Sequence, residues 1–344
     1  MAQAGIQENP QTAPAIRLMF GGDVMLGRHV KEHILRDGPD YPLEPVAQLR
    51  SAPDLTVVNL ECALTSSLDT WTGAPKAFYF GAPPQAIHSL LGAGIDMVSL
   101  ANNHALDFGV DGLVETQRLL RRHGIQQAGT GRDIGEAAAP AIVERCGVRF
   151  GMAAFCDHQQ DFSARPNSPG IAYLDLDDEF AAVAALRSAL EPLQRVAVDW
   201  PILSLHWGPN MALRPSQKFR RLAHPAIEMG WKILFGHSAH IFQGIEIHRG
   251  CPIIYAVGNL VDDYRGDPEF RNDHQLLFEM ELAGGGLRRT VLHPLVIEEC
   301  QARPAADAHL DYIADWMNAL CGEMGTRMRR DGAWLWIDGP SAFN

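Results

Sequence analysis

The chain has 344 residues and is 47% hydrophobic, so it is long enough to build one large domain or two ordinary ones around a sizeable core. Its 29 basic and 41 acidic residues give a formal net charge of −12 at pH 7. This charge repels phosphate backbones and argues against nucleic acid as a partner. None of the six cysteines forms a C-x-x-C pair, so we expect neither a zinc–thiolate site nor a disulfide framework.

The beginning of the chain has no secretory signal, because it lacks a basic start followed by an apolar stretch. No run approaches the ~18 apolar residues that are needed to span a bilayer. From the sequence we therefore expect a flexible tail over residues 1–15, no membrane partner and a cytoplasmic location.

Short apolar runs bounded by turn residues occur along most of the chain and predict strands that are buried on both faces. They are Ile16–Phe20, Leu55–Leu60, Met97–Leu100, Phe150–Phe155, Ile202–Leu205, Ile233–Phe235 and Ile253–Val257. Amphipathic stretches between these runs predict helices over Pro84–Ala93, Val110–His123, Asp178–Leu190 and Ser216–Met229. Such an alternation of strands and helices is typical of an α/β fold with a parallel or mixed sheet.

The last third of the sequence has a different pattern. Leu276–Glu281 and Leu287–Leu292 flank a glycine-rich turn and predict a β-hairpin. Farther on, apolar residues recur at helical spacing, from Leu310 to Leu320. We therefore predict one catalytic domain over residues 16–300 and a C-terminal helical extension over residues 301–344.

Five of the predicted strands end in a titratable or metal-binding group. These groups are Asp23, Glu61, Asn103 with His104, His206, and His237 with His240. Taken singly, each is an ordinary turn or surface residue. Because ligands of open α/β sheets bind beyond the carboxyl ends of the strands, the set as a whole indicates a metal or catalytic cluster.

The types of side chain in this set limit the metal. Carboxylates, imidazoles and an amide oxygen without thiolate suit Mn, Fe, Zn, Co or Mg. A carboxylate that bridges two ions about 3.5–4 Å apart is the arrangement of phosphatases and nucleases. We expect one or two divalent ions per chain, with Glu61 as the candidate bridge.

Several motifs around these residues resemble the CapA (poly-γ-glutamate capsule biosynthesis) family, in the family's order and over roughly residues 17–263. They are Gly22–Arg28, Asn59–Glu61, Ser99–Gly109, His206–Gly208, Gly236–His240 with Gln243-Gly244, and Tyr255–Leu260. That family is similar in fold to the calcineurin-like metallophosphoesterases. The resemblance therefore implies an α/β fold of the four-layer αββα sandwich type, with the metal site at the strand ends.

The resemblance also implies a role for each residue of the set. It makes Asp23 and His240 ligands of a first metal, Glu61 the bridging carboxylate and Asn103 the amide ligand. It makes His206 and His237 ligands of a second metal, and His104 the catalytic acid.

The sequence departs from the phosphoesterase pattern at three places. Met25 stands where phosphoesterases have a histidine, and Glu61 where they have an aspartate. Ser238 and Ala239 both lie between the last two histidines, where the pattern has a single residue. One site is thus a ligand short, so a single tightly held ion is an alternative to two.

Four further residues are candidates for supporting roles. Arg28 is predicted to hold a phosphate or carboxylate of the substrate, or else to pair with a structural acid such as Asp107. Asp107 is predicted to orient His104. Trp207 forms a wall of the substrate pocket or packs in the core, and Lys76 lies in a polar loop that is long enough to cover the site.

The sequence leaves three functions open. The first is a hydrolase that activates water and cleaves a phosphoester or a poly-γ-glutamate or glutamyl-type amide, with His104 protonating the leaving group. The second is a peptide epimerase in which the metal serves as Lewis acid. The third is a non-catalytic component of capsule biosynthesis. A small-molecule or peptide substrate is expected, and the sequence does not indicate an oligomeric state.

Overall fold

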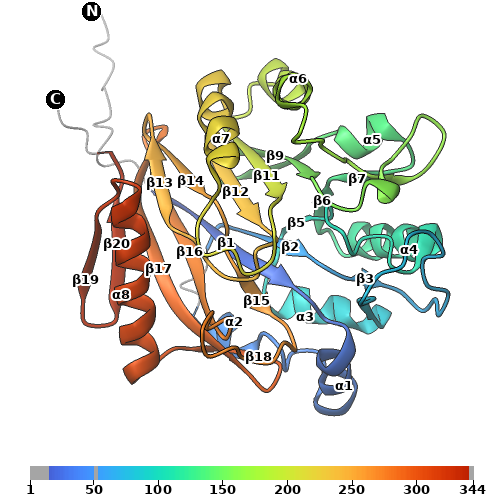
Figure 1. The fold of residues 1–344 in the computed structure, drawn as a ribbon, viewed down its shortest axis with the longest axis horizontal. Coiled ribbons are helices and arrows are strands. Elements are labelled where there is room, and N and C mark those ends of the chain that lie inside the picture. The colour runs from blue at the N-terminus through green and yellow to red at the C-terminus, as the bar shows by residue number, and fades with distance from the viewer. Residues whose placement is uncertain (1–14, 50–52, 341–344) are drawn as a thin grey trace, which may run out of the picture.

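The computed structural model describes residues 15–49 and 53–340. The predicted flexible tail lies outside the described residues except for Ala15. The described chain forms two large sheets with helices around them (Figure 1). Among these helices, none is long and apolar enough to cross a membrane.

The first sheet is mixed and contains both the first strand and the last strands of the chain. In spatial order its strands are β19 (Met328–Asp331), β20 (Trp334–Asp338), β17 (Gly286–Glu298), β16 (His274–Ala283), β1 (Ile16–Val24), β2 (Leu55–Leu60), β5 (Met97–Ser99) and β6 (Gln126–Ala128). Two more strands, β15 (Asn259–Val261) and β18 (Gln301–Pro304), pair with β1 and β17. Strand β1 is parallel to β2 and β15 and antiparallel to β16, so it joins the parallel half to the antiparallel half.

The second sheet contains the middle of the chain. Its order is β13 (Ile245–His248), β14 (Cys251–Ile254), β12 (Ile233–His237), β11 (Trp200–His206), β9 (Val148–Cys156) and β8 (Ala141–Arg145). The four inner strands are parallel and the two outer ones are antiparallel to their neighbours. Two small strand pairs lie outside the large sheets: β3 (Ala63–Leu64) with β4 (Gly81–Ala82), and β7 (Thr130–Gly131) with β10 (Gly170–Ile171).

The buried side chains show how the layers pack. One core cluster joins inward-facing residues of both sheets, and the rings of Phe20 on β1 and Phe235 on β12 lie 4.9 Å apart in it. A second cluster packs α1 (Arg28–Asp37), α2 (Glu44–Leu49), α3 (Ile87–Gly92) and α4 (Gly109–Arg122) on the first sheet. A third packs α6 (Glu179–Arg195) and α7 (Gln217–Met229) on the second sheet, next to the short α5 (Ile134–Ala138). The layers are therefore helices, sheet, sheet and helices.

The C-terminal region differs from the predicted helical extension. It contains one helix, α8 (Asp307–Glu323), which packs Ile313 and Met317 into the core between the sheets. The rest is β-structure, because β18 and the hairpin of β19 and β20 extend the first sheet. In β20 the buried Leu335 and Ile337 alternate with more exposed residues, which is the period of a strand and not of a helix. The prediction of helix throughout residues 301–344 was therefore wrong for these segments.

Candidate metal centre

The predicted cluster lies where the carboxyl ends of strands from both sheets meet. Asp23 lies near the end of β1, and Glu61 follows β2 in the same sheet. His206 and His237 end β11 and β12 of the second sheet and are direct neighbours in its register. All four side chains are buried. The structure thus brings together residues that are more than 200 positions apart in the sequence.

A close approach between two strands places Asp23. A Cβ atom on Gly22 would lie 2.1 Å from the carbonyl oxygen of Gly258, so only glycine lets β1 run so near the start of β15. The amide of Asp23 donates to the same carbonyl oxygen, at 2.9 Å. Asn59 then fixes the carboxylate by donating to Oδ1 of Asp23 at 2.8 Å.

The turn after β12 carries His240 back over the site. Ser238 and His240 have positive φ angles of 99° and 61°, a left-handed conformation that is uncommon for residues other than glycine. In this position Nδ1 of His240 lies 3.4 Å from Asp23 Oδ2 and 4.0 Å from Glu61 Oε2. Nδ1 also lies 3.0 Å from Oδ1 of Asn259. Strained backbone at such a point is typical of a functional site.

Two groups of three side chains could each hold an ion, and they share Asp23. One group is Asp23, His206 and His237, and the other is Asp23, Glu61 and His240; within each, the ligand atoms lie within 4.8 Å of one another. The role predicted for Glu61 as the bridge stays a prediction. In the arrangement seen here, Asp23 is the carboxylate common to both groups.

His206 and His237 contact each other, and each also has a polar partner. The Nδ1 atoms of His206 and His237 lie 2.8 Å apart, and Nε2 of His206 lies 3.1 Å from Oδ1 of Asn103. Ser204 Oγ lies 2.9 Å from Nε2 of His237. Asn103 therefore reaches the histidine pair through its side-chain oxygen, as an amide ligand would.

Burial and mutual repulsion dominate the electrostatics of the two carboxylates. Burial and the adjacent charge of Asp23 raise the pKa of Glu61 well above its usual range. Burial acts in the same direction on Asp23, but the hydrogen bond from His240 and the charge of His237 outweigh it and lower its pKa. Burial would lower the pKa of His240, yet the charges of Glu61 and Asp23 raise it to about 10. The two carboxylates thus attract positive charge into the space between them.

The residues present fit a divalent ion. Glu61 Oε1 is buried and has no hydrogen-bond partner among the described residues. An unsatisfied buried carboxylate oxygen costs free energy unless a cation or a donor meets it. Together with imidazoles and an amide oxygen, this oxygen belongs to a donor set suited to Mn, Zn, Fe or Mg.

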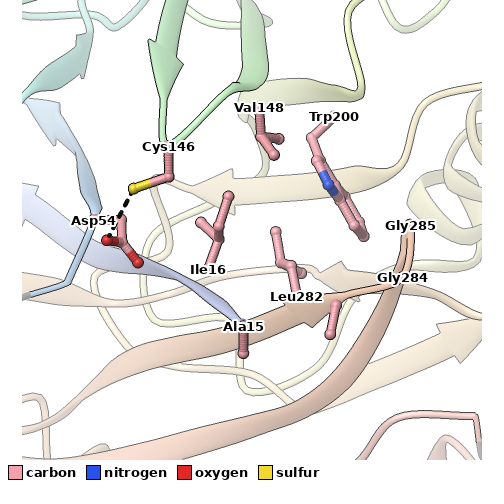
Figure 2. A pocket seen from close by; sticks show the side chains of 10 residues that line it. Ala15, Ile16, Asp54, Cys146, Val148, Trp200, Leu282, Gly284 and Gly285 are labelled. Carbon is pink, nitrogen blue, oxygen red and sulfur yellow. Dashed lines mark hydrogen bonds between the residues drawn. The ribbon is translucent and has the colours of Figure 1, made fainter. Parts of the chain in front are cut away.

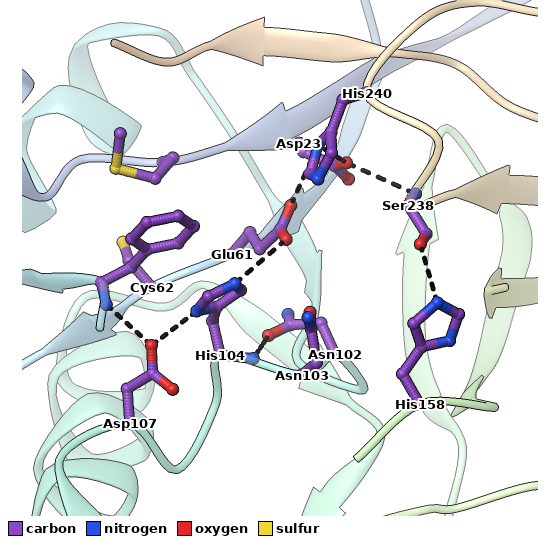
Figure 3. A network of polar contacts seen from close by, with 12 residues as sticks. Asp23, Glu61, Cys62, Asn102, Asn103, His104, Asp107, His158, Ser238 and His240 are labelled. Carbon is purple, nitrogen blue, oxygen red and sulfur yellow. Dashed lines mark hydrogen bonds and ion pairs between the residues drawn. The ribbon is translucent and has the colours of Figure 1, made fainter. Parts of the chain in front are cut away.

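His104 lies beside the cluster and is held by a chain of polar contacts (Figure 3). Its Nε2 lies 3.8 Å from Glu61 Oε1, and its Nδ1 lies 2.5 Å from Oδ2 of Asp107. The ring stacks on Phe80 with a centroid separation of 3.8 Å. Burial lowers the pKa of His104 to about 4, although Asp107 acts to raise it. The predicted contact between Asp107 and His104 is therefore present.

Lys76 also reaches this site from the loop between β3 and β4. Its ammonium group contacts Asp107 and the backbone carbonyl of Asn103, and it lies 3.5 Å from Nδ1 of His104. The side chain is almost fully buried. A cation at this position neutralises Asp107 and fixes the loop over the site.

A cavity of about 450 Å³ opens above the cluster and reaches it through His104 and His240. Lys76, Phe78, Asn210 and Tyr264 are among the other residues that line it. A second cavity, of about 410 Å³, lies at the opposite ends of the strands, where Ile16, Val148 and Trp200 begin β1, β9 and β11. Figure 2 shows the side chains that line it. It is largely apolar, with Cys146 Sγ lying 3.7 Å from Asp54 Oδ1, and none of the predicted ligands lines it. The cavity beside His104 is therefore the candidate substrate site.

The two predicted substrate contacts, Arg28 and Trp207, have different surroundings. Arg28 pairs with Asp263 at 3.2 Å and lies over the ring of Phe78 at 4.8 Å, so its acidic partner is Asp263 and not Asp107. Trp207 stacks on Phe219 at 4.5 Å in the core beneath α7. The position of Trp207 does not support contact with a substrate.

Sequence reasoning missed several residues that hold the site. Asn59 hydrogen-bonds to Asp23, and Asn259 contacts His240. Both asparagines lie within the family motifs, Asn59–Glu61 and Tyr255–Leu260, but neither was predicted to hold the site. His158 was not singled out; its ring lies 5.7 Å from that of His206, and Ser238 Oγ approaches its Nε2 at 3.5 Å. The only signal for His158 was its place just after a predicted strand.

The fold and the site together define an α/β protein with a buried carboxylate–histidine centre at the strand ends. The family model described as bacterial capsule synthesis protein PGA_cap matches residues 17–264, and the chain belongs to this family.

Related proteins cover almost the whole chain. A probable polyglutamine synthesis accessory protein of Mycobacterium tuberculosis strain H37Rv is 29% identical, over 91% of this chain and 93% of its own length. The capsule biosynthesis protein CapA of Bacillus anthracis is 26% identical, over 90% of this chain and 75% of its own. The PGA biosynthesis protein CapA of Bacillus subtilis strain 168 is 25% identical, over 88% and 78%.

Solved structures with a similar course of the chain include a 5′-nucleotidase precursor from Thermus thermophilus. It is 13% identical, covers 91% of this chain and 59% of its own, and has a TM-score of 0.44. At this score the likeness adds nothing to the argument for function.

Proposed function

We propose that this member of the PGA_cap family is a metal-dependent hydrolase that cleaves an amide of a glutamyl-type polymer or peptide, or a phosphoester. The observation that carries the proposal is the pair of ligand groups that share the buried Asp23, set beside His104 at the lining of a cavity. Two carboxylates and three imidazoles buried together are costly to keep unless a cation or a reaction needs them.

The fold relationship belongs to the same proposal. We infer that the order of helices, sheet, sheet and helices is that of the calcineurin-like metallophosphoesterases. Ligands at the carboxyl ends of strands from both sheets support this inference.

Each residue of the proposed site has a distinct task. One ion would be held by Asp23, His206 and His237, with Asn103 as a further ligand. The other ion would be held by Asp23, Glu61 and His240. A divalent ion bound there acidifies water and polarises a carbonyl or phosphoryl oxygen. His104 Nε2 faces the cluster and moves a proton to or from the reacting group.

Asp107 and Lys76 set the orientation of His104. Asp107 accepts from Nδ1 of His104 and so leaves Nε2 free to face the substrate. Lys76 balances the charge of Asp107. Phe80 stacks on one face of the imidazole and so shields that face from solvent.

The names of the relatives support a glutamyl-type substrate. Two of them are capsule or PGA biosynthesis proteins and another is a probable polyglutamine synthesis accessory protein. The cavity, of about 450 Å³, is of a size that takes a small molecule or a short peptide segment. A small-molecule or peptide substrate and a cytoplasmic location complete the proposal.

One observation favours epimerisation as a second candidate. His104 and His240 both line the cavity, and Glu61 lies between them, 3.8 Å from one ring and 4.0 Å from the other. Two titratable rings beside one substrate carbon could remove an α-proton and return it on the other face. The third hypothesis, a non-catalytic capsule component, predicts metal binding without turnover.

The first experiment measures bound metal by elemental analysis in protein purified without chelator. We expect about two ions per chain to be held at this centre, so Glu61→Gln should bind about one ion fewer than the wild type and Asp23→Asn about two fewer, because Asp23 belongs to both ligand groups. Asp54→Asn, at the opposite ends of the strands, is the control and should bind as the wild type does.

Full metal content in Asp23→Asn, with the fold intact by circular dichroism, would overturn the proposed centre. Loaded protein is then incubated with γ-glutamyl peptides and with a phosphodiester in deuterated water. Cleavage supports the hydrolase. Deuterium at an α-carbon without cleavage supports the epimerase, and neither product supports the non-catalytic component.

A further inference from the structure

A second group of histidines and carboxylates lies on the outer side of the second sheet, away from the proposed centre. Two of its members are on α7, where His224 and Glu228 are four residues apart and share one face of the helix. The other two are on β13, where Glu246 and His248 alternate with Ile247 and so point to the same side of the strand.

The four side chains meet in the space between the helix and the strand. His224 Nε2 lies 2.8 Å from Glu246 Oε1, and His248 Nε2 lies 3.1 Å from Glu228 Oε1. The two imidazole rings are parallel, with centroids 4.2 Å apart and an interplanar angle of 2°. The group is therefore compact, and each histidine already directs a ring nitrogen at a carboxylate.

We propose that His224, Glu246 and His248 bind a divalent transition-metal ion of the zinc type, with Glu228 as the fourth ligand. The ligand atoms of the first three lie within 4.8 Å of one another. In a tetrahedral zinc site with bonds of about 2.0–2.1 Å, the ligand atoms are about 3.4 Å apart and their lone pairs converge, so the two stacked rings must tilt apart for both to bind one ion. Two imidazoles and carboxylates without thiolate favour Zn²⁺ or Cu²⁺ over Mg²⁺ or Ca²⁺.

Metal binding would displace the hydrogen bond between His224 and Glu246. The hydrogen bond between His224 and Glu246 needs a proton on one of the two groups. A metal ion at Nε2 of His224 takes the place of a proton there, and the neutral ring then carries its proton on Nδ1. Glu228 also pairs with Arg249 at 3.0 Å, and this ion pair must open for Glu228 to become a ligand.

A further residue orients the carboxylate. The hydroxyl group of Tyr255 donates to Oε2 of Glu246 at 2.7 Å, whereas His224 contacts the other oxygen. Ligating carboxylates and histidines in metal sites are commonly held by such outer partners. Tyr255 thus leaves Oε1 of Glu246 to face the proposed ion.

The proposed ion would join two elements that otherwise meet through side-chain contacts alone. Strand β13 is the end strand of the second sheet and pairs with β14 on one side. Helix α7 packs on the same sheet through Leu222 and Ala226. An ion between them fastens the end strand to the helix layer, so the site is structural and independent of the proposed reaction.

The test compares Zn²⁺ binding in chelator-treated wild type and in His224→Gln/His248→Gln, by titration calorimetry and elemental analysis. We expect the variant to lose one ion per chain, and Zn²⁺ to raise its melting temperature less than that of the wild type. The matched control is His88→Gln/His123→Gln, a histidine pair with rings 5.8 Å apart that belongs to no ligand group among the described residues.

The proposal is overturned if the two double variants bind the same number of ions with the same affinity. If the first variant does not fold, Glu246→Gln and Tyr255→Phe take its place. We expect Tyr255→Phe to keep the ion but to bind it about ten-fold or more weakly. Unchanged affinity in both single variants would contradict the assignment equally.

Discussion

Among single residues, His274 on β16 has an unusual environment. It is buried, its Nδ1 has no hydrogen-bond partner among the described residues, and its Nε2 lies 2.8 Å from Nδ1 of His309. Asp273, Arg271 and the ring of Tyr312 also face it. Burial lowers the pKa of His274 to about 4, although Asp273 acts to raise it.

This pKa predicts how stability changes with pH. Between pH values near 6.5, the ordinary pKa of histidine, and about 4, the unfolded chain binds a proton at His274 that the folded chain does not. His274 therefore makes the folded state less stable as pH falls through this window. We expect the melting temperature of His274→Gln to fall less than that of the wild type between about pH 7 and pH 4.5. His29→Gln, at an exposed ring, is the control.

The ligands of the proposed centre could be placed from sequence because each follows a recognisable apolar run. Asp23, Glu61 and His237 needed no more than the rule that strand ends gather at one edge. To predict the residues that contact these ligands, the register between the paired strands must also be known. Asn259 meets His240 because β15 pairs with β1 at Asp23, and no local pattern encodes that pairing.

Among the elements, helix α6 shows how a single side chain secures a helix end. The helix follows Asp178, whose Oδ1 accepts from the amide of Ala181 at 2.9 Å. Four amides at a helix start lack partners within the helix, and such a cap satisfies one of them.

We predict that Asp178→Ala lowers the free energy of unfolding by about 1 kcal/mol. Urea denaturation followed by circular dichroism measures the change. Asp178→Asn keeps a side-chain acceptor and should stay within a few tenths of a kcal/mol of the wild type. A loss in Asp178→Asn as large as that in Asp178→Ala would show that the cap is not the cause.

The elements that sequence reasoning missed have weak or short patterns. In α1, Val30 and Ile34 are the buried residues in a largely charged stretch, so its apolar stripe is narrow. The hairpin of β19 and β20 lies in the segment predicted as helix, because the apolar stripe of α8 directly precedes it. Helix α4 was predicted to within one residue at each end and β16 over its middle, because apolar residues recur along both segments.

At the scale of the whole molecule, the packing of the two sheets determines whether the centre exists at all. Asp23 and His237 belong to different sheets, and Nδ1 of His237 lies 3.7 Å from Oδ1 of Asp23. Phe20 and Phe235, three and two residues earlier on the same strands, pack against each other between the sheets.

We predict that Phe235→Ala lowers the free energy of unfolding by about 3–5 kcal/mol, the usual loss for a buried aromatic ring. It should also weaken metal binding at the proposed centre, because the sheets lose the contact that sets their spacing. Denaturant unfolding and metal titration measure the two effects. The control is Phe180→Ala, whose ring is 87% exposed and whose loss should change stability by about 0.5 kcal/mol or less. If Phe235→Ala folds and binds metal with unchanged affinity, the proposed centre does not depend on this contact between the sheets.

The close approach of Gly22 to Gly258 has a consequence for how the protein is made. The chain emerges from the ribosome from its first residue onward, and Asp23 is synthesised long before the strand that fixes it. Strand β1 pairs with β15 and β16, so a nascent chain that ends before residue 259 lacks both of these neighbours. Contacts of such long sequence separation form late and slowly. The proposed centre therefore assembles only when synthesis is nearly complete, and an ion can be fully bound only after that point.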